Sequence, residues 1–261
     1  LETLAGRRRV WQPSLALAVT IGLHPSTVAL SPALLIVAWV WRMGREGEGE
    51  RGRKGAWKTA MWQVAWPMML VAGSVILLME LSGNGLAALT SSDRPGGGDG
   101  RMFVPLFEAT TRWEHYTMFS WAHLVDWLNM QPLTAPVTLG GLAIMGGALL
   151  AAHLSWPVNS QTGTAKHAEA SSEGQALAFL ALCTGLYWLF TWVWNPDYGG
   201  QRDWDLFSLA AIPSTLLLAR LLPKVLSDRG QLAQAGLMLT AVSAMHTMAW
   251  IYQNTRPWEW P

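Results

Sequence analysis

The sequence has 261 residues, of which 51% are hydrophobic and 13% are charged, and its formal net charge at pH 7 is +1. Soluble domains carry about 25% charged residues, so this composition indicates a protein whose main solvent is lipid. The near-neutral charge does not point to nucleic acid as a partner. The single cysteine, Cys183, excludes an internal disulfide and a cysteine metal cluster.

Two short apolar runs, residues 10–23 and 27–41, open the chain. Each is shorter than the roughly 20 residues that a membrane span needs. We therefore expect either a hairpin of two short helices or one long helix that is kinked at Pro25 and again near Pro32. The hairpin is preferred because it places the arginines at 7–9 and the basic segment that follows on one side.

The middle of the chain alternates between charged and apolar segments. Residues 42–58 are charged and rich in glycine, and we expect a basic cytoplasmic loop there. Residues 59–81 are apolar and long enough to span a membrane. We expect residues 82–132 to form an outer loop, in which the helical spacing of residues 115–130 predicts an interfacial or cavity-lining helix.

Four more apolar runs complete the prediction of a single transmembrane domain. With the first two runs counted as a short hairpin, the sequence predicts an all-α polytopic bundle of about seven spans. Residues 155–173 are predicted to be a polar linker. The four runs are residues 133–154, 175–194, 206–222 and 231–252.

The basic loops predict the orientation of these spans. Lysine and arginine concentrate in cytoplasmic loops, and they gather here in residues 42–58 and around Lys224 and Arg229. We therefore expect residues 195–205 on the periplasmic or extracellular side of a bacterial cytoplasmic membrane. Tryptophans near predicted helix ends fit interfacial anchors; they include Trp39, Trp41, Trp192 and Trp194.

The densest group of charged side chains lies between two apolar runs, in residues 195–208. A polar cluster in this position is a candidate for function in a membrane protein. Arg202 can bind phosphate oxygens with two hydrogen bonds, and Asp203 and Asp205 offer oxygen ligands for a divalent metal. In the structural alternative, an aspartate caps the next helix and Arg202 pairs with a carboxylate. Further candidates for binding substrate in this loop are Asp197 and Tyr198.

A second group of candidates lies in residues 115–130. It consists of His115, Tyr116, His123, Asp126 and Asn129. His123 and Asp126 are three residues apart, so on a helix the carboxylate can orient the imidazole as a base. The alternative is hydrogen-bonded packing against the 195–205 loop. His24, at the tip of the predicted hairpin, is a further candidate for lining a shared cavity.

Three short passages resemble the membrane portion of bacterial GT-C-type glycosyltransferases, which transfer sugars from polyprenyl-phosphate donors on the outer face of the cytoplasmic membrane. The first is Gly22-Leu-His-Pro-Ser26 with Leu30-Ser-Pro-Ala-Leu34. The second is His115-Tyr-Thr-Met-Phe-Ser120 with His123-Leu-Val-Asp126 and Asn129. The third is Asn195-Pro-Asp-Tyr-Gly199 with Arg202-Asp-Trp-Asp-Leu-Phe207.

The resemblance implies a lipid-linked sugar donor but no catalytic residue in this chain. Such enzymes carry their principal catalytic carboxylate in a first outer loop, and nothing here matches that loop. The resemblance, together with the initial Leu1, predicts a C-terminal part of a longer chain, in which Arg202, Asp203 and Asp205 contact the donor or shape its cavity. The alternatives are a non-catalytic accessory subunit of a membrane complex and a transporter fragment.

Overall fold

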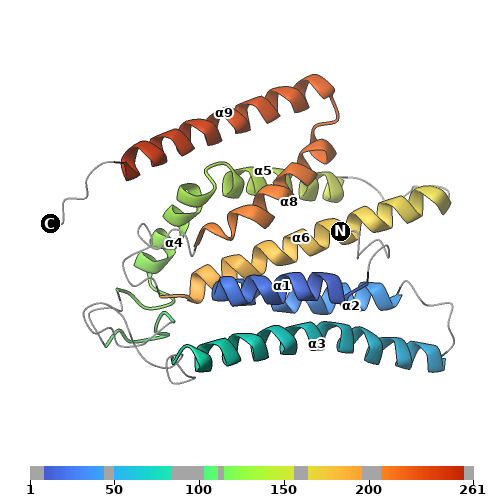
Figure 1. The fold of residues 1–261 in the computed structure, drawn as a ribbon. Coiled ribbons are helices and arrows are strands. Elements are labelled where there is room, and N and C mark those ends of the chain that lie inside the picture. Colours follow the sequence, from blue (N-terminus) through green and yellow to red (C-terminus); the bar gives the residue numbers. More distant parts are fainter. Residues whose placement is uncertain are drawn as a thin grey trace. The chain divides into compact units, whose positions relative to one another are not determined.

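The computed structural model describes residues 9–43, 50–83, 103–110, 115–155, 164–195 and 207–255. These residues are mainly helical (Figure 1), and they contain one isolated β-bridge, between Phe103 and Trp194. The expected all-α fold is therefore confirmed. In chain order the helices are α1 (Trp11–Leu23), the 3₁₀ helix η1 (Pro25–Leu30), α2 (Ser31–Met43), α3 (Glu50–Leu81), α4 (Trp121–Thr134), α5 (Thr138–Ser155), α6 (Thr164–Val193), α8 (Ala211–Val225) and α9 (Arg229–Asn254).

The contacts divide the chain into two compact units. Unit 1 holds α1, η1, α2, α3 and α6, together with the described residues between α3 and α4. Unit 2 holds α4, α5, α8 and α9.

Two of the described helices are long and apolar enough to cross a membrane. They are Gly55–Leu81 within α3 and Glu173–Val193 within α6, which agree with the predicted spans at 59–81 and 175–194. The chain is therefore that of an integral membrane protein. The bent pair α4–α5 adds a third span only if the two helices are counted together, so the prediction of seven spans is not confirmed.

Both long helices start earlier than the sequence pattern indicated. α3 reaches back to Glu50, into the expected loop at 42–58, and α6 reaches back to Thr164, into the expected linker at 155–173. These extensions are rich in Glu, Lys, Arg and Ala, which are good helix formers. The low hydropathy of both segments predicted loops, but the helix propensity of their residues extends each helix beyond its apolar part.

A buried core joins the two ends of the expected hairpin in unit 1. Val10, just before α1, and Val40, near the end of α2, belong to one cluster with Ala60 of α3. The hairpin is therefore confirmed. Trp41 is buried in the same cluster, whereas Trp39 is half exposed.

Polar contacts also fix α1 against α3 near this core. Ser14 is fully buried, and its hydroxyl donates to the Val64 carbonyl at 2.6 Å. The backbone N–H of Val10 donates to Gln63 Oε1 at 3.0 Å. In lipid, a buried polar group must find a partner within the protein, so these bonds set the register of the two helices.

The helix predicted for residues 115–130 begins later, at Trp121, and runs to Thr134. Residues 115–120 form turns, in which the N–H of Met118 donates to the Pro105 carbonyl at 2.7 Å. That bond uses the backbone N–H of Met118, which a helix through Met118 would need for its own hydrogen bonds. The polar periodicity of residues 115–130 therefore predicted too early a helix start. The segment around residue 104 is itself held on α6, because the N–H of Val104 donates to the Val193 carbonyl at 2.9 Å.

In unit 2, α5 and α8 pack closely through a glycine. A Cβ atom at Gly141 would lie 2.8 Å from Leu218 Cδ2, so any larger residue would require the Leu218 side chain to move. α5 starts at Thr138, after a bend of 99° from α4, and α8 starts at Ala211. Both helices are therefore shorter than the runs predicted at 133–154 and 206–222.

The last helix, α9, agrees with the predicted run at 231–252. Asp228 caps it, since its carboxylate accepts from the N–H of Gln231 at 2.8 Å. None of its residues is buried, and it does not reach the apolarity of the two spans in α3 and α6.

Candidate functional site

The tip of the α1–α2 hairpin lies within the length of the α3 span. A Cβ atom at Gly22 would lie 3.3 Å from Val75 Cγ2 and 3.5 Å from Val71 Cγ1. These valines are about 5 to 10 Å beyond Met68, the midpoint of the span Gly55–Leu81. Gly22 is two residues before His24, so the tip lies at the depth of the half of the α3 span that ends at Leu81.

The short helices of the hairpin explain this depth. α1 and α2 have 13 residues each, which corresponds to a length of about 20 Å. Pro25 restricts the preceding residue to extended conformations, and His24 has φ −144° and ψ 94°. α1 therefore ends at Leu23, and Pro25 is well suited to start the 3₁₀ helix η1.

Polar side chains meet at this tip. Ser26 Oγ lies 2.6 Å from His24 Nδ1, and the imidazole tautomer decides which of the two atoms donates. The hydroxyl of Thr27 donates to the His24 carbonyl at 2.9 Å. Ser26 and Thr27 are buried, and His24 is half-buried. The tip thus presents an imidazole next to a buried hydroxyl between two apolar helices, and polar side chains in such a place in a membrane protein are often functional.

α6 brings further polar groups to the same half of unit 1. η1 packs against α6, whose Phe179 contacts the core near Val64 at the other end of the unit. Beyond Phe179, α6 carries buried polar side chains on successive turns, and the chain leaves the helix through Asn195, which is 1% exposed. These polar residues of α6 are Thr184, Tyr187 and Thr191.

The arrangement supports binding more directly than catalysis. The imidazole of His24 and the hydroxyl of Ser26 can exchange hydrogen bonds with a polar group. Among the described residues in this half of unit 1, the carboxylates are Glu80 and Glu108, and both are exposed. No described carboxylate is thus placed to orient His24 as a base, and the described residues contain no group of three or more His, Cys, Asp or Glu that could hold a metal ion.

The second group of candidates divides between the two units. His115 and Tyr116 lie before α4 with their ring centroids 6.4 Å apart. His123 and Asp126 share α4, where His123 is 2% exposed and Asp126 is half-buried. Asn129, on the same helix, is exposed and thus does not share the buried environment of His123.

The charged loop lies outside the described residues, and with it Asp197, Tyr198, Arg202, Asp203 and Asp205. Its two flanks are described. Asn195 is buried in unit 1, next to Trp194, whose ring makes an edge contact with Phe103 at 5.9 Å. Phe207, which is 4% exposed, is buried in unit 2.

Sequence reasoning selected His24 but missed its partners, Ser26 and Thr27. The sequence did contain a signal, because Ser and Thr side chains at turns and helix caps often form hydrogen bonds to nearby backbone groups. Comparison of the chain with protein-family models, with curated proteins and with solved structures gives no match.

Proposed function

We propose that this chain is the membrane module of a GT-C-like glycosyltransferase that uses a lipid-linked sugar donor on the outer face of the cytoplasmic membrane. The observation that carries the proposal is the His24–Ser26 pair, with its 2.6 Å contact, at the tip of the apolar hairpin. A lipid-linked donor has its polar group at the membrane surface, so a polar tip between apolar helices suits its headgroup. The tip also falls within the first passage of the resemblance, Gly22-Leu-His-Pro-Ser26.

In this proposal residues of the hairpin tip and of the charged loop bind and position the donor. His24 and Ser26 hydrogen-bond to the polar part of the donor nearest the bilayer. Arg202, in the charged loop after Asn195, takes the phosphate oxygens. The principal catalytic carboxylate lies outside this chain, as the resemblance implies.

A structural observation favours a second candidate, an accessory subunit of a larger membrane complex. α9 has no buried residue, and large apolar side chains on it are exposed, among them Leu237, Met238, Met245 and Met248. Methionine adapts readily to different partners. Such a helix offers a contact surface to neighbouring subunits.

Sugar transfer from a panel of polyprenyl-phosphate sugars distinguishes the two candidates. The full-length protein in detergent would be compared with the variants His24→Ala, Arg202→Ala and Asp203→Ala. We expect His24→Ala to lower kcat/KM about tenfold or more, which is the effect of about 1.4 kcal/mol lost from the transition state. Thr20→Ala is the control, since Thr20 is exposed and its hydroxyl bonds within its own helix.

The outcomes separate the site assignment from the function. Wild-type activity in the His24 and Arg202 variants would remove both residues from the donor site. No transfer by well-folded full-length protein with any donor would favour the accessory subunit.

A further inference from the structure

Charge is distributed unevenly along unit 1. Val10, Trp41 and Ala60 lie in one buried cluster, against which Phe179 of α6 packs, so three chain segments adjoin the same end of the unit. They are residues 1–9, 42–58 and 164–173. Together these segments hold ten basic and six acidic residues, whereas residues 80–120, which follow the other end of α3, hold three basic and five acidic residues.

α3 marks the membrane boundary at the basic end. Its residues 59–79 carry no charge and extend over about 30 Å, which matches the hydrocarbon thickness of a typical bilayer. Lys58 directly precedes this stretch and Glu80 directly follows it, and both are exposed. Lys58 therefore lies at the head-group level of one leaflet.

The basic residues of α3 continue its exposed face. Trp62 is 61% exposed, and Lys58, four residues before it, is also exposed. Lys54 and Arg51 continue the spacing of three to four residues, which places them on the same face of the helix. Ala56, on the opposite face, is buried. The lipid-facing stripe of α3 thus becomes basic where the helix leaves the hydrocarbon.

The start of α1 brings a second cation beside this stripe. The N–H of Val10 donates to Gln63 Oε1 at 3.0 Å. Arg9 directly precedes Val10 and is exposed, so it lies next to α3. Gln63 is about 8 Å from Lys58 along the helix axis. Two cations from distant parts of the sequence therefore share one end of unit 1.

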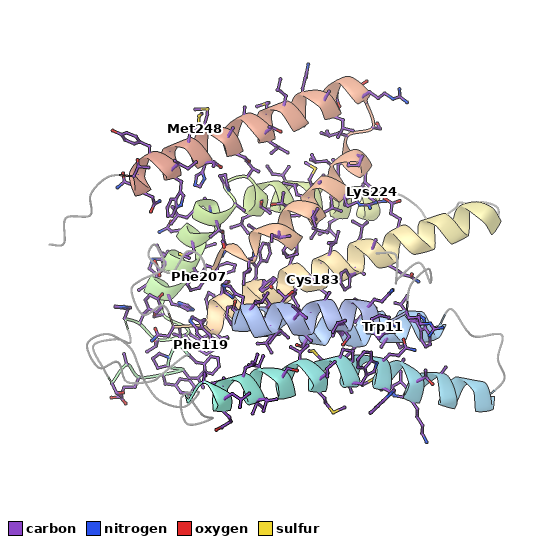
Figure 2. All side chains as sticks on the ribbon, viewed as in Figure 1. Trp11, Phe119, Cys183, Phe207, Lys224 and Met248 are labelled. Atoms are coloured by element: carbon purple, nitrogen blue, oxygen red, sulfur yellow. The ribbon has the colours of Figure 1, made fainter. Side chains whose placement is uncertain are left out.

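Each of these cations has tryptophan neighbours. Trp11, labelled in Figure 2, follows Arg9 by two residues, and its ring centroid lies 6.0 Å from that of Trp66. Trp57 directly precedes Lys58 and is 37% exposed. Tryptophan rings are enriched at the head-group level of membranes. Aromatic rings and cations at one membrane boundary suit the phosphates of lipid head groups.

We propose that this end of unit 1 binds the head groups of anionic phospholipids in the leaflet on the Lys58 side. The planar guanidinium of Arg9 suits two phosphate oxygens, and Lys58 supplies a point charge. The acyl chains of such a lipid lie along the exposed face of α3, from Trp62 toward Met69. The contact does not depend on sugar transfer, so it does not rest on the proposed function.

Photocrosslinking from the lipid head group tests this contact. The full chain would be reconstituted in nanodiscs of phosphatidylcholine and phosphatidylglycerol that contain a trace of phosphatidylglycerol with a diazirine in its head group. Phosphatidylcholine with the same diazirine is the zwitterionic comparison. After irradiation, mass spectrometry would map the adducts along the chain.

The variants change one cation at a time. Lys58→Gln and Arg9→Gln each remove a charge from the proposed surface, and Lys58→Arg keeps the charge. Arg229→Gln is the matched control, because Arg229 is exposed in unit 2. Thermal unfolding of each variant would establish that it is folded.

We expect phosphatidylglycerol adducts to concentrate on residues 9–11 and 57–62. Lys58→Gln and Arg9→Gln should each lower these adducts about fivefold, which corresponds to the contribution of about 1 kcal/mol from one basic residue near an anionic surface. Lys58→Arg and Arg229→Gln should leave them unchanged. Raising the salt from about 0.15 M to about 1 M should also lower them, because the Debye length falls from about 8 Å to about 3 Å.

Two results would overturn the proposal. Equal labelling of these residues by the two lipids, unaffected by salt or by Lys58→Gln, would indicate ordinary surrounding lipid. The absence of adducts from either lipid on residues 9–11 and 57–62 would show that protein, and not lipid, covers this end of unit 1.

Discussion

The two units interrupt their apolar helices in different ways. In unit 1, η1 turns the chain back between α1 and α2, and its polar side chains bond to their own neighbours. In unit 2, a short break bends α4 from α5 by 99° (Figure 1). Prolines stand at both breaks, Pro25 in the first and Pro136 in the second. Proline chemistry thus marks where a helix stops, but not whether the chain then reverses or bends.

The polar groups at the two breaks differ in how far their bonds reach. At the first break, Ser26 and Thr27 bond to His24 within the turn. At the second, Thr138 Oγ1 lies 3.4 Å from Thr215 Oγ1 of α8, so this contact joins distant parts of the chain. We expect the first break to depend on local bonds and the second on packing against α8.

Gly141→Leu should give the largest change in stability, because it affects the packing of α5 on α8. The larger side chain would displace the buried Leu218, whose Cδ2 lies 2.8 Å from the position of a Cβ atom at Gly141, and overpacking of this kind costs about 1 to 3 kcal/mol. Denaturant unfolding in mixed micelles would measure the loss. Gly140→Leu is the control, since a Cβ there meets nothing within 4 Å. An equal loss in both variants would show that close packing at Gly141 is not what holds the second break.

Ser26→Ala should have the next largest effect, because it removes the hydroxyl that contacts His24 Nδ1. A typical hydrogen bond contributes about 1 kcal/mol, and the loss should concentrate in η1. Hydrogen exchange of the backbone amides of residues 26–30 would report it. Thr20→Ala, in an exposed position with a bond to Ala16 of its own helix, should leave this exchange unchanged, and equal behaviour of the two variants would contradict the role of Ser26.

The pair Thr138 and Thr215 should give the smallest effect. Hydrogen bonds between membrane helices average about 0.6 kcal/mol in double-mutant cycles, and the separation of the two oxygens is long at 3.4 Å. A cycle of Thr138→Val and Thr215→Val, analysed from unfolding free energies, would measure the coupling. A coupling of zero would indicate that packing such as that of Leu218 on Gly141, and not this hydrogen bond, stabilises the contact of α5 with α8.

Side-chain environments show where the sequence was insufficient. Cys183 on α6, labelled in Figure 2, is buried, as its place within an apolar run indicates. Trp39 and Trp41 are of the same type and two residues apart, yet one is half exposed and the other is buried. Helical periodicity orders residues around an axis, but only the neighbouring helices determine which side is covered.

The candidate site was predictable in part. His24 was selected from its place between two apolar runs, and His123 and Asp126 were expected on one helix, where they lie. Residues 115 and 116 were assigned to that helix wrongly, because the bond between Met118 and Pro105 joins residues that no local pattern connects. The depth of the tip was also hidden, since it depends on the contact of Gly22 with Val71 and Val75.

Hydropathy and proline act locally along the chain, so the sequence predicts the helical class, the two spans in α3 and α6, and the break at His24-Pro25. The depth of the hairpin tip along α3, the 99° bend between α4 and α5, and the close approach of Leu218 to Gly141 are visible only in the folded chain. Each of these depends on a side chain from a distant helix. Gly140 and Gly141 are adjacent and chemically identical, and only the position of Leu218 distinguishes them.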